Sequence, residues 1–354
     1  MTLELSVVRG PLAEEDLDAI GATYGAAVDP RYASREFCRA VFNGNPSGHS
    51  FHAFVRDGGK TVGHYAIVPV RARARGSTVL SGKGEALYLA EAYRKSTIAT
   101  PAGEALVGLA MMNALHERAL AGGVAFIHSV TTPAVAVLLR MQGFRVLKLT
   151  LDQLHFLVRP PQLKESTRSR ALLARLTSAV QRVLLAAARA GLRLTGAPRT
   201  EVDPAAHEGG QLAAFSATDG QAGATWAVSR DLENLAWMKR LGRLEVVSIA
   251  GRPDRFAVLV RAQRSELLHW SVPPAARRDG LAIVCGILAR GVRTGTGTFS
   301  VSRRLAGEAG PSLRLALRLL AFLPTRIPIS LLVKTDDDFY ARPGNVDFSR
   351  MFHL

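Results

Sequence analysis

The chain has 354 residues, of which 48% are hydrophobic and 21% charged, a mixture typical of globular rather than disordered proteins. This length favours two domains over a single core. The net charge of +16 comes from 38 arginines and seven lysines, and only two cysteines, Cys38 and Cys285, are present. Two cysteines exclude a disulfide framework and a cysteine-rich zinc site. Without a signal peptide or a long uncharged apolar window, the sequence predicts a cytoplasmic protein.

The first part of the chain predicts helices and strands in the order of an α/β fold. Helical spacing of apolar residues covers 12–42, and a dense turn signal fills 43–48. Two apolar runs around a glycine-rich turn then predict a β-hairpin. The predicted strands are 51–55, 61–68, 85–90, 124–130 and 146–158, and the later helices are 103–120 and 132–141. Helices that cross a mixed sheet are therefore expected.

The second half of the chain repeats this order of elements. Its predicted strands are 244–249, 256–261, 267–272, 297–301 and 329–334, and its predicted helices are 232–241, 280–290 and 313–323. The order repeats but the residues do not, which indicates a degenerate tandem repeat. We expect a first lobe over 1–158, a linker over 159–199 and a second lobe over 200–354.

The linker differs in charge from both neighbours. Residues 159–199 carry nine basic residues and one acidic residue, Glu165. Four arginines recur every seven residues, and an apolar set occupies another face, which predicts an amphipathic helix. The arginines are Arg168, Arg175, Arg182 and Arg189, and the apolar residues are Leu172, Leu173, Leu176, Val180, Val183 and Leu184. Two interpretations stay open: a linker helix packed on one domain with its arginines in water, or a basic dock over 168–193 for a membrane surface, an acyl carrier protein or RNA.

Residues 62–144 carry the motifs with chemical content. They comprise the strand Val62-Gly-His-Tyr-Ala66, the segment Glu85-Ala-Leu-Tyr-Leu-Ala-Glu-Ala-Tyr-Arg94, the helix 103–120, the strand Gly123-Val-Ala-Phe-Ile127 and the closing Gly143-Phe144. In this order they resemble the Gcn5-related N-acetyltransferase (GNAT) superfamily. The resemblance implies an α/β fold with two such lobes in tandem, and acetyl-CoA or another acyl-CoA as co-substrate.

The resemblance also implies where the acyl-CoA would bind. Two parallel strands separate in that superfamily, and the pantetheine arm fills the gap as a pseudo-strand. Here the backbone at Leu87 and Leu89 would pair with it. The pyrophosphate would lie at the start of the next helix, near Arg94, Lys95, Ser96, Thr97 and Gly103. The chain reads Arg94-Lys-Ser-Thr-Ile-Ala99 where the superfamily has Arg/Gln-x-x-Gly-x-Gly/Ala, so either the loop is remodelled or phosphate binding is lost.

The catalytic residues also depart from the pattern of the superfamily. Many members carry a tyrosine acid seven residues after an asparagine, and the matching positions here are Leu139 and Thr132. Proton chemistry would then depend on a base. Glu85 is the first candidate, followed by His128 and Tyr88, although a solvated strand-end carboxylate and a core histidine are the alternatives. The spacing of His49, His52 and His64 does not fit zinc ligands, so no metal site is predicted.

These features favour an acyl-CoA-dependent N-acyltransferase that acts on a primary amine of a small molecule. The resemblance extends to two-lobed proteins of polysaccharide assembly, which suggests an amino sugar of a surface polysaccharide as acceptor. A Fem-type aminoacyltransferase that uses aminoacyl-tRNA is one alternative, with the basic helix on the RNA backbone. A binding protein whose catalytic site has decayed is the other.

Overall fold

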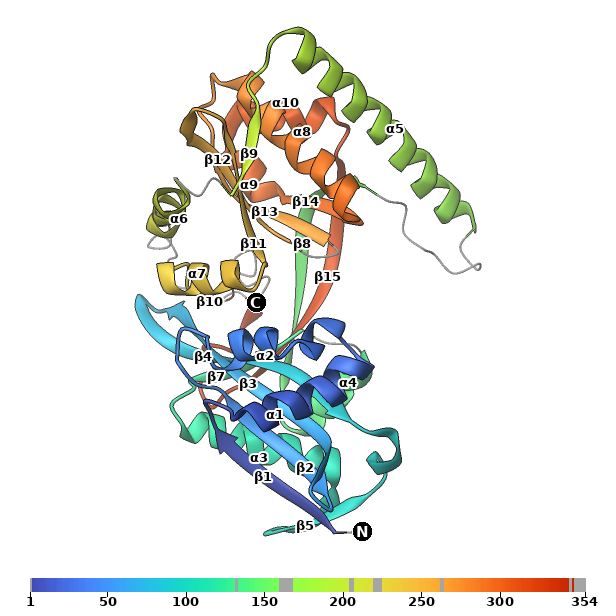
Figure 1. The fold of residues 1–354 in the computed structure, drawn as a ribbon, viewed down its shortest axis with the longest axis vertical. Helices are drawn as coiled ribbons and strands as arrows, with labels where there is room; N and C mark the ends of the chain where they lie inside the picture. The colour runs from blue at the N-terminus through green and yellow to red at the C-terminus, as the bar shows by residue number, and fades with distance from the viewer. Residues whose placement is uncertain are drawn as a thin grey trace.

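The computed structural model describes residues 2–130, 133–158, 168–203, 207–218, 225–261, 264–343 and 346. Figure 1 shows two lobes, and one mixed sheet runs through both of them. The strands are β1 (Leu3–Arg9), β2 (Phe51–Asp57), β3 (Lys60–Ala74), β4 (Ser77–Leu89), β5 (Thr97–Thr100), β6 (Gly103–Leu106), β7 (Phe126–Ser129), β8 (Arg145–Leu157), β9 (Thr200–Val202), β10 (Trp226–Val228), β11 (Leu244–Ile249), β12 (Arg252–Val260), β13 (Arg264–Ser271), β14 (Thr298–Ser302) and β15 (Leu323–Lys334). The α/β class predicted from the sequence is confirmed.

The helices cover the sheet on both faces. The short helices are η1 (Gly21–Gly25), η2 (Pro30–Ala33) and η3 (Glu91–Tyr93). The α-helices are α1 (Glu14–Ile20), α2 (Arg35–Phe42), α3 (Val107–Ala121), α4 (Pro133–Met141), α5 (Arg168–Leu194), α6 (Glu208–Ser216), α7 (Leu232–Arg240), α8 (Arg277–Thr294), α9 (Arg303–Glu308) and α10 (Gly310–Leu319).

Alternation of side chains along the strands assigns the two faces of the first lobe. Phe54 and Val68 point into a core that α1 and α2 share with α6 and α7 of the second lobe. Phe51 and Ile67 point to the opposite core, where they meet α3 and α4. Because strand side chains alternate with a period of two, adjacent segments of one hairpin supply both cores.

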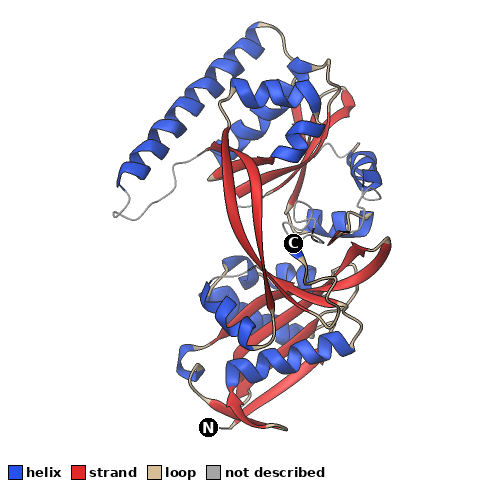
Figure 2. Cartoon of the chain, turned by 180° about the vertical axis from the view of Figure 1, so that it is seen from behind, coloured by secondary structure: helices blue, strands red, loops and turns tan. Residues whose placement is uncertain are grey.

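The two lobes exchange their last strands. β8 and β15 pair antiparallel from Leu323↔His155 to Val333↔Arg145, and Figure 2 shows this long pair crossing from one lobe to the other. The end of β15 pairs with β7 of the first lobe, and the end of β8 pairs with β14 of the second. Each sheet is thus completed by a strand from the other half of the chain.

Several predicted boundaries are wrong. The helix expected from Gly103 begins at Val107, because Thr97–Leu106 forms the β5–β6 hairpin instead. The strand expected at 85–90 is only the end of β4, which begins at Ser77. The helix expected at 313–323 runs over Gly310–Leu319; residues 320–322 form a turn, and Leu323 is the first residue of β15.

The basic segment forms the predicted helix, and it packs on one lobe with Arg175, Arg182 and Arg189 exposed, as the linker interpretation expected. α5 packs on the second lobe through a stripe that includes Ser178, Gln181 and Leu185. The apolar face predicted from the sequence remains in water, including Leu173 and Val183. Arg168 is the first residue of this helix.

Candidate functional site

The candidate site is a cleft where β4 and β7 separate. The two strands pair in parallel only from Ser81↔Phe126 to Lys83↔His128, and β4 continues to Leu89. The cleft has a volume of about 460 Å³. Its walls come from both faces of the sheet and consist of Tyr24, Val28, Tyr65, Lys83, Gly84, Glu85, Ala86, Leu87, Ser129, Val130, Val135 and Leu139. A ligand can therefore reach the gap between the strands from both faces.

A β-bulge shapes the β4 wall of this cleft. The register of β3 with β4 shifts between His64↔Tyr88 and Ala66↔Glu85. Ala86 takes up the extra residue with a φ of 52°, a left-handed conformation that costs a non-glycine residue about 1 kcal/mol. Bulges are enriched next to active sites, where they redirect side chains. Here the bulge separates Glu85 from Leu87, and both line the cleft.

Glu85 is held in the cleft by two neighbours. The Tyr32 hydroxyl donates to Glu85 Oε1 at 2.5 Å, and Lys83 Nζ forms an ion pair with Oε2. Burial alone would raise the pKa of Glu85, but the charges of Lys83 and Arg243 and these hydrogen bonds outweigh it, so the pKa is lowered. The carboxylate is therefore ionised at neutral pH.

Two tyrosines of the cleft remain protonated. Burial, and to a smaller extent the negative charge of Glu85, raise the pKa of Tyr24 to about 12. Burial likewise raises the pKa of Tyr65, whose hydroxyl lies 3.4 Å from His116 Nε2. Both phenols are therefore donors rather than bases.

The structure separates the three predicted catalytic residues. Glu85 lines the cleft, whereas His128 is only 5% exposed and packs its ring near Phe126 and Trp226. Burial lowers the pKa of His128 to about 3. Tyr88 is half-buried and lies opposite His64 in the β3–β4 register. Neither His128 nor Tyr88 is among the residues of the cleft wall.

The predicted cofactor residues occupy two places. Leu87 lines the cleft, and Leu89 packs in the core beside α3. Arg94 Nε donates to the Leu89 carbonyl at 3.4 Å. Ser96 accepts a hydrogen bond from Val107 N, so it touches the first turn of α3.

The remaining predicted cofactor residues lie in or next to the hairpin. Lys95 precedes it, Thr97 opens β5, and Gly103 opens β6 with a φ of 112°. Residues 97–106 therefore form a hairpin where the sequence predicted the start of a helix. Leu139, which stands where many members carry the tyrosine acid, lines the cleft and has no acidic hydrogen to give, while Thr132 lies outside the described residues.

Sequence reasoning missed four residues around Glu85. Lys83 could have been found, because a spacing of two on a strand places it on the same face as Glu85. Tyr24 and Tyr32 come from a helical segment with no motif. Arg243 comes from the second lobe, is 8% exposed, and its Nε has no hydrogen-bond partner among the described residues. No pattern in the sequence connects it to Glu85.

The corresponding region of the second lobe is closed. β13 and β14 form the equivalent parallel pair, but the space where they part measures about 50 Å³ and contains Glu266, Arg304 and Glu308. The first turn of α8 carries Asp279, which binds Arg252 and Arg255. A carboxylate thus already occupies the anion-attracting end of this helix.

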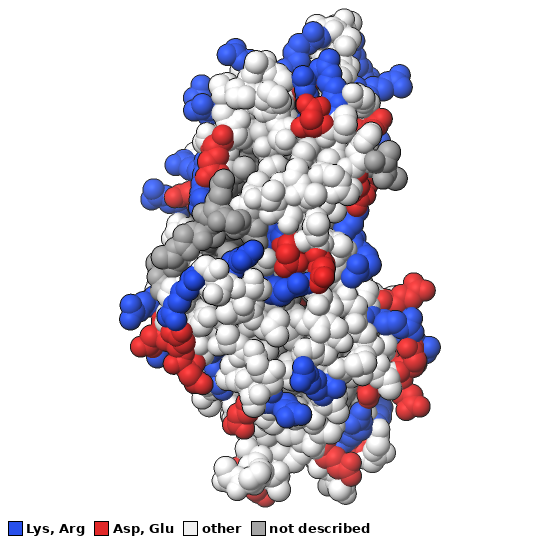
Figure 3. All heavy atoms as spheres, turned by 90° about the vertical axis from the view of Figure 1, so that its left-hand side faces the viewer, with Lys and Arg blue, Asp and Glu red and all other residues white. Residues whose placement is uncertain are grey.

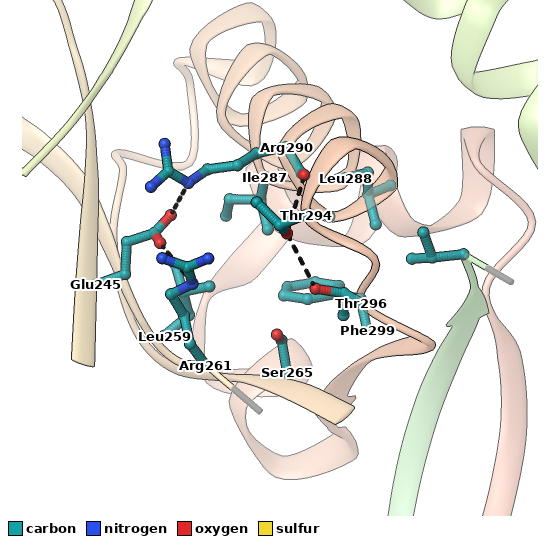
Figure 4. A pocket seen from close by; sticks show the side chains of 12 residues that line it. Glu245, Leu259, Arg261, Ser265, Ile287, Leu288, Arg290, Thr294, Thr296 and Phe299 are labelled. Carbon is teal, nitrogen blue, oxygen red and sulfur yellow. Dashed lines mark hydrogen bonds and ion pairs between the residues drawn. The ribbon is translucent and has the colours of Figure 1, made fainter. Parts of the chain in front are cut away.

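A second buried carboxylate fills the interior of this lobe. Figure 4 shows Glu245 between Arg261 and Arg290, with both Nε atoms 3.1 Å from its oxygens. Burial raises the pKa of Glu245 despite the two guanidinium charges. The adjoining cavity measures about 20 Å³, a volume on the scale of one water molecule.

The described part of the chain has neither a metal-binding cluster nor a membrane-spanning helix. Among these residues no group of three or more histidine, cysteine, aspartate or glutamate side chains is arranged to hold a metal ion. Within the same ranges, no helix combines the length and apolarity needed to cross a membrane.

Comparisons with known proteins place the fold. No family model matches the chain, and no curated protein matches it. Solved structures do match. A conserved protein of unknown function from Enterococcus faecalis V583 has a TM-score of 0.53 and 9% identity, covering 96% of this chain and 74% of that one. GCN5-related N-acetyltransferases from Kribbella flavida (14% identity, covering 94% and 71%) and Anabaena variabilis ATCC 29413 (11%, covering 95% and 74%) both have a TM-score of 0.51. The predicted GNAT fold is thereby confirmed.

Proposed function

We propose that the chain is an acyl-CoA-dependent N-acyltransferase that acylates a primary amine in the cleft of the first lobe. The observation that carries the proposal is the gap between β4 and β7, which opens through the sheet beside an ionised carboxylate. Backbone groups of residues 84–89 have no β7 partner there. The amides of a pantetheine arm are suitable partners, because unpaired strand groups in a buried setting require hydrogen bonds.

The residues around the gap fit an acyl thioester on one face of the sheet. Leu87, Val135 and Leu139 supply an apolar wall for the arm and the acyl chain. α3 begins beside it, and the first N–H groups of a helix have no partner within the helix. Val107 N is already bonded to Ser96, so the N–H groups from Gly108 onward are the ones we assign to the pyrophosphate. Arg94 and Lys95 precede this turn and add positive charge.

The acceptor would enter from the opposite face, past Tyr24 and Val28. Its amine nitrogen forms the new bond to the acyl carbon, and the carbon–sulfur bond breaks. We assign Glu85 as the group that takes the amine proton, since it is ionised and lines the gap. Leu139 gives no proton to the leaving sulfur. The sulfur departs as a thiolate, which needs no acid because an ordinary thiol has a pKa of only about 8.5.

The proposal includes the kind of amine that would be acylated. We propose an amino sugar of a surface polysaccharide as the first acceptor to test, following the resemblance of the sequence. A cleft of about 460 Å³ lies within the range of small-molecule sites, about 300–1,000 Å³.

Two measurements test this function. Acetyl-CoA and longer acyl-CoA thioesters should raise the melting temperature, because a ligand at one hundred times its Kd stabilises the native state by about 2.7 kcal/mol. A thiol-release assay with amino sugars and amino-acid amines should then identify an acceptor. No thermal shift with any thioester would contradict the proposal. In that case, salt-sensitive binding of tRNA would indicate aminoacyl transfer instead, and no binding of either would indicate a decayed site.

A further inference from the structure

Helix α5 exposes a continuous apolar stripe to water. Five large apolar side chains of this helix are between 56% and 68% exposed: Leu172, Leu173, Leu176, Val180 and Val183. From Leu173 onward they follow one another at intervals of three and four residues, which places them on one side of a helix. Clustered exposure of this kind marks an interaction site, whereas single exposed apolar residues are ordinary.

The opposite stripe of α5 is fixed to the body of the protein. Gln181 accepts a hydrogen bond from Leu157 N at 2.8 Å and donates to the Ala321 carbonyl at 2.7 Å. Ser178 donates to the Leu157 carbonyl at 3.0 Å, and Leu185 is buried one turn further on. Rotating the helix to bury its apolar stripe would break all three hydrogen bonds. The stripe is therefore held outward.

The charge beside this stripe has one sign. Arg175, Arg182, Arg189 and Arg193 follow one flank of α5, and residues 168–194 contain no aspartate or glutamate. Arg189 and Arg193 also line a groove of about 360 Å³ together with Arg199, Arg290 and Arg293. Figure 3 shows the side of the molecule away from α5, where basic side chains also lie on the second lobe, with a few acidic ones among them. The partner of α5 must combine an apolar region with negative charge.

The shape of the molecule suits a flat partner. Figures 1 and 2 show α5 along the outer edge of the second lobe, with the rest of the described chain on one side of it. A second copy of the chain fits this face poorly, because two arginine-rich helices without a carboxylate would repel each other. RNA offers no apolar surface against which the five exposed leucines and valines could be buried. A bilayer with anionic lipids meets both requirements.

We propose that α5 docks the protein on an anionic membrane surface. The apolar stripe enters the boundary between headgroups and acyl chains, and the arginines contact the lipid phosphates. The helix lies along the surface and does not span it. This inference is independent of the acyltransferase proposal, since it rests on residues outside the cleft and its test needs no substrate.

Vesicle flotation tests the proposal with the full chain. We expect the protein to float with vesicles of phosphatidylcholine and phosphatidylglycerol, and not with phosphatidylcholine alone. A triple variant, Leu173→Ser, Leu176→Ser and Val183→Ser, should weaken binding about 100-fold, at about fivefold for each partly inserted side chain. Arg175→Gln with Arg182→Gln should weaken it about 25-fold at low salt and far less at high salt, at about fivefold per arginine.

The matched control changes exposed leucines elsewhere. Leu232→Ser with Leu319→Ser removes side chains that are about half exposed, and flotation should not change. Circular dichroism and thermal unfolding check that every variant folds. The proposal is overturned if wild-type protein does not float with anionic vesicles, or if the triple variant floats as well as wild type. It is also overturned if light scattering shows a dimer that the triple variant abolishes, since the stripe would then bind a second copy.

Discussion

Replacing Glu85 by glutamine tests the chemistry of the cleft most directly. Glutamine keeps the length of the side chain and can still accept from the Tyr32 hydroxyl, but it cannot take up a proton at neutral pH. A positioned base contributes about 10²–10⁴-fold in rate. We therefore expect kcat to fall within this range in the thiol-release assay, with little change in the affinity for acyl-CoA.

The same substitution affects stability, and the structure gives the magnitude. Glu85 and Lys83 form a largely buried ion pair, and a hydrogen bond to a charged group contributes about 1.5–3 kcal/mol. Glu85→Gln should lower the free energy of unfolding by about this amount. Because the folded-state pKa of Glu85 lies below its ordinary 4.5, the ionised form contributes stability above that pH, and the contribution is lost as the pH falls through the folded pKa. The stability difference between wild type and variant should therefore vanish in acid.

Tyr32→Phe is the matched control for this experiment. It removes the 2.5 Å hydrogen bond to Glu85 Oε1 but leaves the carboxylate in place. We expect a loss of stability similar to that of Glu85→Gln with a much smaller loss of kcat. Wild-type turnover in Glu85→Gln would refute the assignment of the base, and equal losses of kcat in both variants would show that Glu85 acts only through the fold.

Three further substitutions probe the surroundings of the cleft. Ala86→Gly should raise the free energy of unfolding by about 1 kcal/mol in urea, since glycine adopts the 52° φ without strain, and a loss of stability would contradict the strained bulge. His128→Asn should leave kcat within severalfold of wild type. It should also flatten the fall of stability between about pH 6.5 and 3 by about 1.4 kcal/mol per pH unit, because the unfolded chain binds one more proton there than the folded chain with its buried neutral imidazole. Leu139→Tyr should raise kcat if a proton donor at this wall of the cleft reaches the leaving sulfur, and an unchanged kcat with intact folding would place the sulfur elsewhere.

Local patterns of the sequence predicted most of the helices and strands. Two apolar runs around a glycine-rich turn predicted the β2–β3 hairpin, and glycines predicted the end of α3, because both signals act over a few neighbouring residues. The extension of β3 and β4 beyond residue 68 was missed, since Pro69 and the arginines that follow it resemble a loop. The short strand β5 was not predicted, for a related reason. Thr97 pairs with Leu106 across a turn, and no apolar pattern marks such an exposed hairpin.

The candidate site was predictable only where it follows one strand. Glu85 and Leu87 lie on β4, so a resemblance of consecutive residues was sufficient to find them. Tyr32 and Arg243 reach Glu85 from segments 53 and 158 residues away, and only the tertiary fold brings them there. The burial of His128 depends on Trp226, which arrives with β10 of the other half of the chain. Contacts of this kind cannot be predicted from neighbouring residues in the sequence.

The exchange of β8 and β15 makes each lobe depend on the other for its fold, although only the first lobe has a large cleft between its parallel strands. Each of these strands completes the sheet of the other lobe, so the second lobe must stay folded for β15 to reach β7 beside the first-lobe cleft. The first-lobe cleft therefore requires a folded second lobe, but it does not require an open gap between β13 and β14. The charges found there fit this division, since Asp279 is bound by Arg252 and Arg255 at the start of α8 and Glu266 faces a gap of about 50 Å³. Arg243 shows that the second lobe also acts on the first-lobe site directly, because its charge helps to keep Glu85 ionised.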